Sequence, residues 1–278
     1  LEIESADPPL PGTGQLQAHW IDADTIAWPA GLIRGANAAD LTWSLESSAT
    51  ADLALVEGVL EGSDESSALT HLPSGLTAAQ LEAKPALAGY AALSVGDLTR
   101  EQVTQLLTTQ LHVLARNSED EPVGFSGVQL PGVLDDLYAA DLAYAELGAV
   151  FVEGAPQFRL WAPTAQSARL LLWDNADDDP TVVDPVFDEA SGVWTATPEA
   201  NAAGAQYLWE VEVYAHSTRA IEANQVTDPY SVALTVNSTR SIAIDLSDSQ
   251  WAPEIWTDTQ TPVVERQVDR AIYELHVR

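Results

Sequence analysis

The chain has 278 residues, with 42 acidic and 11 basic side chains, a formal net charge of −31 and no cysteine. A charge of this sign repels phosphate backbones and anionic lipids, so it argues against nucleic-acid binding and membrane-surface roles. The missing cysteines exclude disulfides and thiolate metal sites, and no window approaches the run of about eighteen apolar residues that a membrane-spanning helix needs.

The acidic excess is explained by solubility, although it also suits an uncharged ligand or a salty or cold habitat. The first residues, LEIESADPPLPGTGQ, contain neither a basic segment nor a long apolar one, and they lack an initiator Met. We therefore expect a processed or truncated start rather than a signal peptide. A chain without cysteine is compatible with both secretion and the cytosol, and of the two we expect a secreted or cell-surface protein.

The first half of the chain predicts strands with two helices among them. Residues 16–20 (LQAHW) and 25–28 (TIAW) flank an Asp-containing turn, which predicts a β-hairpin. Apolar residues at helical spacing predict a helix at 99–107, where a Thr begins the segment, and another at 133–147. Further strands are predicted at 41–45, 54–60, 90–95 and 111–115. We expect residues 1–147 to form an accessory β-domain that resembles an open sandwich and ends in the second helix.

The second half predicts short strands at regular intervals, separated by turn clusters such as DEASG and NAAG. Such spacing is typical of an all-β sandwich, so we expect an immunoglobulin-like β-sandwich over residues 148–248. The strands are predicted at 157–161, 168–173, 193–197, 207–214 and 241–246. Residues 249–270 have no clear period and are interpreted as a linker. The last residues, 271–278 (AIYELHVR), have the pattern of a buried strand.

Motifs that carry chemistry are mostly missing. The sequence has no phosphate-binding glycine loop, no H-E-x-x-H and no G-x-S-x-G, and its five histidines are isolated from one another. With 42 acidic residues, a hydrolytic carboxylate pair is neither excluded nor indicated. The acidic turn at 174–179 (DNADDD) is interpreted as a solvated turn, with weak calcium binding as the alternative.

The nine tryptophans admit two interpretations. Aromatic faces stack on sugar rings, but Trp also fills cores and domain interfaces, which is its more frequent role. Four of them fall in the predicted second sandwich: Trp161, Trp173, Trp194 and Trp209. Composition and periodicity alone therefore predict a two-domain, β-rich protein of unknown role.

A resemblance to a known family goes further. FRLWAPTAQSARLLLW (158–173) resembles the start of the family-48 carbohydrate-binding module of isoamylase-type enzymes, and QVTDPYSVALTVNS (225–238) is similar to the end of that module in type I pullulanases. LQAHWIDADTIAWP (16–29) and GVQLPGVLDDLYA (127–139) resemble the preceding domain of pullulanases and plant limit dextrinases. AIYELHVR is similar to the first strand of their catalytic (β/α)₈ barrel. The chain is thus identified as the N-terminal portion of a debranching enzyme of glycoside hydrolase family 13.

The resemblance implies a mainly β fold: two consecutive β-sandwich-like domains, the first with helices, and then the first barrel strand at 271–278. It implies hydrolysis of α-1,6-glucosidic linkages in pullulan, amylopectin and limit dextrins, by an Asp nucleophile and a Glu acid/base. In the family these carboxylates end later barrel strands, so we expect no catalytic residue in this chain and no activity from residues 1–278 alone. We expect no required cofactor, with calcium left open.

The implied partners are an α-glucan and the catalytic barrel of the same polypeptide. Sugar contacts are expected from Trp194, Tyr207 and Trp209. Glycogen-binding relatives place a Lys next to this Tyr, where Leu208 stands here, so a module that only supports the barrel is the alternative. The residues expected at the interface with the barrel are Trp161, Asp228, Tyr230 and His276, the last of which would pack inside the barrel.

Two rival identities remain. One is a stand-alone glucan-binding or regulatory module with no enzyme attached. The other is the N-terminal part of an isoamylase or of a branching enzyme, because FRLWAP is shared with those enzymes.

Overall fold

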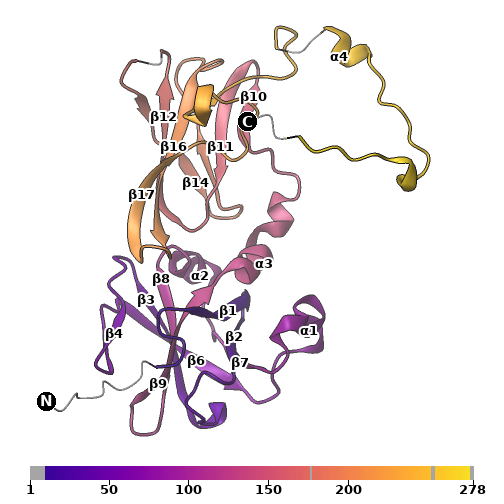
Figure 1. The fold of residues 1–278 in the computed structure, drawn as a ribbon. Coiled ribbons are helices and arrows are strands. Elements are labelled where there is room, and N and C mark those ends of the chain that lie inside the picture. Colours follow the sequence, from indigo (N-terminus) through magenta and orange to yellow (C-terminus); the bar gives the residue numbers. More distant parts are fainter. Residues whose placement is uncertain (1–9, 176, 252–253, 276–278) are drawn as a thin grey trace, which may run out of the picture. The chain divides into compact units, whose positions relative to one another are not determined.

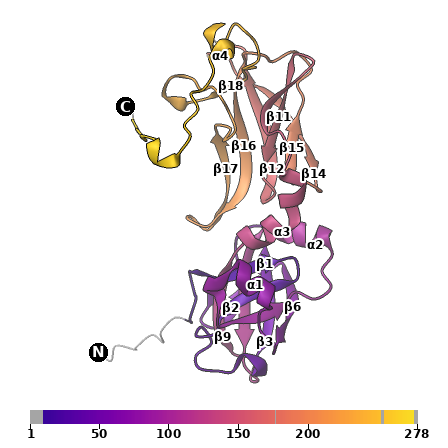
Figure 2. The same ribbon diagram turned by 90° about the vertical axis from the view of Figure 1, so that its right-hand side faces the viewer.

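The computed structural model describes residues 10–175, 177–251 and 254–275. The chain divides into two compact units, one that ends at Ala243 and one that begins at Ile244. The first unit contains a closed β-barrel followed by a two-sheet sandwich (Figures 1 and 2). The prediction of a mainly β protein is confirmed. Among the described residues, no helix has the length and apolar content that crossing a membrane would require.

Seven strands form the barrel, and its closure depends on strands from opposite ends of the domain. In spatial order they are β1 (Leu16–Asp22), β2 (Thr25–Pro29), β7 (Tyr90–Ser94), β6 (Glu65–Leu72), β3 (Thr42–Ser48), β8 (Gln110–Arg116) and β9 (Pro122–Gln129). β1 closes the ring by parallel pairing with β9, with Leu16 opposite Gly127. We expected an open sandwich here; closure removes both sheet edges, and the period of a strand does not reveal its partners.

The barrel is filled by tryptophans and aliphatic side chains. Trp20, Trp28 and Trp43 are almost completely buried, and the rings of Trp28 and Trp43 meet edge to face with centroids 5.4 Å apart. A short hairpin of β4 (Ala54–Val56) and β5 (Val59–Glu61) lies outside the ring of strands. It brings Leu53 against Leu114 and Phe125 in a small satellite core.

Among the described residues, three α-helices accompany the barrel strands. They are α1 (Ala78–Ala83), α2 (Arg100–Leu106) and α3 (Pro131–Leu142). The helix predicted from Thr99 is confirmed, because Thr99 caps α2 in a capping box with Gln102. The second predicted helix is α3, which starts at Pro131 and ends at Leu142. Its Gly132 lies so close to β1 that an added Cβ would be 2.7 Å from the Cα of Ile21.

The sandwich contains two antiparallel sheets. The first comprises β10 (Gly148–Val152), β11 (Ala155–Trp161), β15 (Val193–Ala196) and β14 (Val186–Asp188). The second comprises β13 (Thr181–Val183), β12 (Ala165–Trp173), β16 (Gln206–Ala215) and β17 (Ala220–Val226), and β18 (Ser241–Ile242) pairs with β16. Their inner faces enclose Phe158, Leu170, Tyr207 and Trp209, all of them fully buried.

A buried carboxylate organises the loop that follows β17. Asp228 is 3% exposed, and its Oδ2 accepts a hydrogen bond of 3.0 Å from the hydroxyl of Tyr207. Its backbone N–H donates to Ser241 Oγ at 3.0 Å, and its Oδ1 accepts from the N–H of Tyr230 at 2.8 Å. Burial raises the pKa of Asp228, while these donors oppose the rise. The loop is therefore tied to the centre of the sandwich.

The second unit contains little regular structure. Its one α-helix among the described residues is α4 (Glu254–Asp258), within the segment that we expected to be a linker. Residues 271–275 lie outside helices and strands, and His276 lies outside the described residues. A barrel strand forms its hydrogen bonds with the neighbouring strands of its barrel, and those strands are not part of these 278 residues. The first catalytic-barrel strand at 271–278 therefore stays a prediction.

Replacement of Tyr207 by Phe should destabilise the sandwich. The change keeps the ring but leaves a buried carboxylate oxygen without its donor, which costs about 1–3 kcal/mol of unfolding free energy. Urea denaturation measures the loss. The matched control is Tyr144→Phe, because Tyr144 is 96% exposed and its change should be within about 0.5 kcal/mol of zero. Equal midpoints for the two variants would contradict the assigned role of the bond.

His112 should make the barrel less stable in mild acid. Burial, helped by repulsion from His216 and Arg219, lowers its pKa to about 4 from 6.5. Between these values the unfolded chain binds a proton that the folded chain does not, so stability falls as the pH falls from about 6.5 to about 4, by up to about 3 kcal/mol.

The comparison that isolates this effect uses His112→Phe, since His112 already stacks on Phe125 with centroids 4.4 Å apart. Its unfolding free energy, measured at several pH values between 4 and 7, should depend less on pH than that of the parent. His71→Gln, on strand β6, serves as the control for the removal of a histidine elsewhere in the barrel. A slope in His112→Phe as steep as the parental one would refute the assignment.

Candidate functional site

Two half-buried aromatic side chains of the sandwich, Trp194 and Phe187, lie together at its end near the N-terminal barrel. Trp194 on β15 and Phe187 on β14 are cross-strand partners, and their ring centroids are 4.7 Å apart at an interplanar angle of 36°. The indole N–H of Trp194 donates to the carbonyl of Ala162 at 2.9 Å. This bond fixes the orientation of the indole, while both rings remain half-buried.

These rings line a pocket of about 290 Å³ between the sandwich and α2. The pocket also contains Glu101, Gln105, Gln166 and Glu189. Gln166 is held across the junction, because its Nε2 donates to the carbonyls of Ala49 at 2.8 Å and Thr108 at 3.3 Å. Ligand pockets of roughly 300–1,000 Å³ combine apolar walls with a few polar groups, and this one is at the lower limit. It can hold a small ring that carries hydroxyl groups.

Tyr207 and Trp209 have a different place. Both are 0% exposed, and Tyr207 packs edge to face on Phe158 with centroids 4.7 Å apart. The two residues are two positions apart on β16, a central strand between β12 and β17, so their side chains lie on the same face. Both point into the space between the sheets. In this structure neither ring is accessible to a sugar. Of the three expected sugar contacts, Trp194 is the one with an accessible surface.

Trp161 lies at an interface, but the interface is between the sandwich and the barrel domain of this chain. Its ring meets Tyr138 of α3 edge to face, with centroids 6.4 Å apart. Gly192 leaves room for the contact between these two rings. It has a φ of +71°, and an added Cβ would be 3.2 Å from Trp161 Nε1. The guanidinium of Arg100 lies 5.3 Å from the centroid of the Tyr138 ring.

Arg100 connects the two domains directly. Its Nη2 donates to the carbonyl of Leu137 in α3 at 2.8 Å and to that of Ala190 in the sandwich at 2.9 Å. Sequence interpretation missed Arg100 and also Phe187. Arg100 stands in the first turn of an ordinary helix and Phe187 in a strand of three residues, so neither carried a distinctive signal.

The remaining predicted residues lie around the Asp228 loop or outside the described residues. Asp228 is inside the sandwich, whereas Tyr230 is 39% exposed. Tyr230 begins a strip in which alternate residues are apolar and exposed: Val232 (60%), Leu234 (46%) and Val236 (84%). His276 falls outside the described part of the chain.

The structure describes most of the acidic turn at 174–179. Asn175 Nδ2 donates to Asp178 Oδ2 at 2.8 Å within it. Across the described residues, no three acidic or histidine side chains converge into a group that could hold a metal ion. Calcium binding at this turn was left open as an alternative and stays untested.

Family models match the two domains in order. Residues 15–136 match the pullulanase N2 domain, and residues 146–231 match carbohydrate-binding module 48, the isoamylase N-terminal domain. The resemblance stated from the sequence is confirmed for both domains.

Comparisons over the whole chain also find similarity to pullulanases. Over 276 residues the chain is 31% identical to a pullulanase of Klebsiella pneumoniae, covering 96% of this chain and 24% of that protein. It is 30% identical to the chloroplastic pullulanase 1 of Arabidopsis thaliana, with 94% and 26% covered. Among solved structures, the maltotriose complex of a mutant PulA from Klebsiella pneumoniae matches with a TM-score of 0.79 at 31% identity, over 90% of this chain and 26% of that one. The chain thus spans about a quarter of the length of these relatives.

Proposed function

Since the chain carries the N2 domain and the family-48 carbohydrate-binding module of the pullulanases, we propose that it is the N-terminal part of a debranching enzyme that hydrolyses α-1,6-glucosidic linkages in pullulan, amylopectin and limit dextrins. The observation that carries this proposal is the similarity to pullulanases along 96% of the chain, at 31% identity and with both domains in the same order. The carbohydrate-binding module is preceded here by a domain that matches the pullulanase N2 family model. This combination favours a pullulanase over an isoamylase or a branching enzyme.

In this proposal residues 1–278 supply the supporting domains. The catalytic carboxylates belong to a separate (β/α)₈ catalytic barrel of the same polypeptide, not to the seven-stranded barrel described above. The two buried acidic side chains among the described residues already have partners of their own. Asp228 is bonded to Tyr207, and Glu46 accepts hydrogen bonds from Ser44, Ser63 and Ser66 at 2.6, 2.7 and 2.8 Å. A catalytic acid or base needs a free oxygen that faces its substrate. These two carboxylates hold strands and loops together instead.

The catalytic barrel is proposed to cover the strip of exposed apolar residues at 230–236. Exposed apolar side chains at four alternate positions are costly in water and typical of a surface that meets a partner. The hydrogen bonds of Asp228 hold the start of this strip against the sandwich, so it presents a formed surface. Contact between this strip and the catalytic barrel would hold the carbohydrate-binding module in place beside that barrel.

A weak glucan contact is proposed at the pocket of Trp194 and Phe187. The fixed indole offers an apolar face, and Glu101 and Glu189 offer acceptors for sugar hydroxyls. The pocket accommodates a short ligand rather than a long chain, so the module would add to the affinity of the whole enzyme instead of binding tightly by itself.

The 278-residue chain by itself should not hydrolyse pullulan. The expected result is no release of reducing ends in the presence of pullulan, at a protein concentration where the same chain extended through its barrel is active. The longer protein is the positive control for substrate and conditions. Hydrolysis by residues 1–278 alone, surviving repurification, would overturn the proposed division of labour.

Replacement of Trp194 or Phe187 by Ala should weaken glucan binding roughly fivefold, since each change removes an aromatic contact worth on the order of 1 kcal/mol. Affinity electrophoresis on amylopectin measures the retardation of each variant. Tyr144→Ala is the matched control, because it removes an exposed ring that lies outside the pocket. If both pocket variants were retarded like the parent, the glucan contact would have to lie elsewhere and the module would act as support only.

A further inference from the structure

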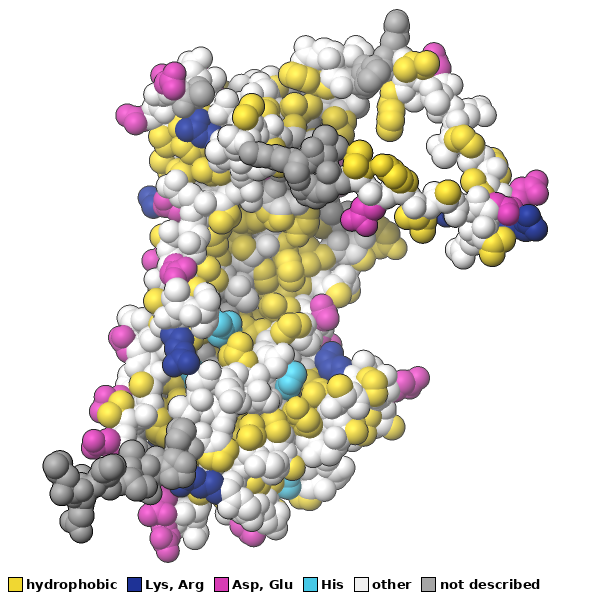
Figure 3. Space-filling model, viewed as in Figure 1, with side chains coloured by type: hydrophobic (Ala, Val, Ile, Leu, Met, Phe, Trp, Pro, Cys, Tyr) yellow, Lys and Arg dark blue, Asp and Glu magenta, His cyan; other side chains and the backbone are white. Residues whose placement is uncertain are grey.

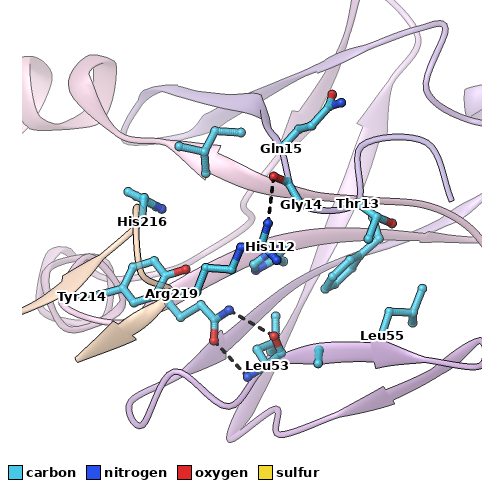
Figure 4. A pocket seen from close by; sticks show the side chains of 13 residues that line it. Thr13, Gly14, Gln15, Leu53, Leu55, His112, Tyr214, His216 and Arg219 are labelled. Carbon is cyan, nitrogen blue, oxygen red and sulfur yellow. Dashed lines mark hydrogen bonds between the residues drawn. The ribbon is translucent and has the colours of Figure 1, made fainter. Parts of the chain in front are cut away.

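A second pocket, of about 330 Å³, lies where the hairpin of β16 and β17 reaches the barrel (Figure 4). The hairpin contributes Tyr214, His216 and Arg219, and the barrel contributes His112 of β8 and the turn that contains Gly14. Among the described residues that line this pocket, none is acidic. This composition is unusual in a chain with 42 acidic and 11 basic side chains. Acidic side chains are scattered along the face that Figure 3 shows.

Arg219 is positioned in this pocket by two special backbone conformations. The residue itself has a φ of +58° at the hairpin turn, where its N–H donates to the carbonyl of Ala215 at 2.7 Å. Its Nη2 approaches the carbonyl of Gly14 at 3.4 Å. Gly14 has a φ of +75°, and a Cβ there would lie 2.9 Å from Arg219 Nη2. A side chain at position 14 would therefore displace the guanidinium.

The guanidinium keeps most of its hydrogen-bonding capacity. It has five N–H donors, and the contact with Gly14 is long and uses one of them. None of the ion pairs between described residues includes Arg219. In Figure 4 its side chain extends between Tyr214 and His112 towards Gly14. A permanent cation is thus held beside a cavity without a carboxylate partner among the described residues.

Two histidines add donors that are neutral at pH 7 and become charged in acid. His112 stacks on Phe125, and its buried Nδ1 has no hydrogen-bond partner in the described structure. His216 meets the ring of Tyr214 edge to face, with centroids 4.8 Å apart. Apolar walls from Leu53 and Phe125 reduce the exposure of any bound group to water, which strengthens electrostatic contacts.

We propose that this pocket binds a small oxyanion of the phosphate or carboxylate class, with the guanidinium of Arg219 as its principal ligand. Arginine presents parallel N–H groups that match two oxygens of such an anion, and charge-assisted bonds of this kind are roughly twice as strong as neutral ones. The proposal does not depend on the glucan-binding or debranching role, and it concerns a different pocket.

Binding should be linked to proton uptake. Burial lowers the pKa of His112 and His216, and a bound anion favours the charged form of both. The other ionisable groups that face the pocket among the described residues are Arg219 and Tyr214, and burial raises the pKa of Tyr214. For one fixed ionic form of the anion, the affinity should therefore rise as the pH falls from 7 towards 5.

Isothermal titration calorimetry of the 278-residue chain with inorganic phosphate, and separately with acetate, tests the proposal at constant ionic strength. Saturable binding of either probe is expected, and Arg219→Gln should weaken it about tenfold or more. Binding of phosphate alone would restrict the class to phosphate esters. Arg169→Gln is the matched control, because Arg169 pairs with Glu210 on the sandwich and should leave binding unchanged.

A second variant leaves the turn at Arg219 untouched. His216→Asn should reduce the gain in affinity at lower pH, and urea midpoints of both variants report whether folding is intact. The proposal is overturned if phosphate and acetate show no saturable binding, or if Arg219→Gln with a parental urea midpoint binds them as the parent does. It is equally overturned if neutral maltotriose binds saturably and Arg219→Gln abolishes that binding, because the pocket would then be a sugar site.

Discussion

The parallel pairing of β1 with β9 is the constraint on which the rest of the first unit depends. Leu16 lies opposite Gly127, where an added Cβ would be 2.5 Å from the Leu16 side chain, so the two strands meet closely. β9 leads directly into α3, whose Gly132 lies against Ile21 of β1. α3 then carries Tyr138 to Trp161 at the start of the sandwich. One strand pair thus closes the barrel and also determines where the second domain begins.

Buried polar groups give each domain a further fixed point. In the barrel, three serine hydroxyls surround the carboxylate of Glu46, and in the sandwich Tyr207 and Ser241 hold Asp228. Each of these groups would be costly to bury alone, and each is acceptable because it is hydrogen-bonded. The acidic surplus of the chain therefore remains mostly at the surface, while the two buried carboxylates specify how particular loops and strands meet.

Local patterns in the sequence predicted local structure well. The capped helix after Thr99 and the alternating residues of β16 were recognisable because capping and strand period are properties of a few neighbouring residues. The barrel closure was not, since its partners are about a hundred residues apart. The sequence led us to expect sugar contacts from Tyr207 and Trp209 and did not reveal that both side chains point inward. The pocket of Arg219 and His112 joins a hairpin turn to a distant strand, and neither residue carries a local motif.

Strand β16 connects two features that lie far apart. Tyr207, near its start, anchors the Asp228 loop, and Tyr214, near its end, lines the pocket of Arg219. At about 3.4 Å per residue, the seven intervening steps span roughly 24 Å of fixed length. Insertion or deletion of one residue here would turn every following side chain to the opposite face. Changes in length should therefore be tolerated in the turns around the strand but not within it, which makes β16 a poor place to insert a tag or a graft.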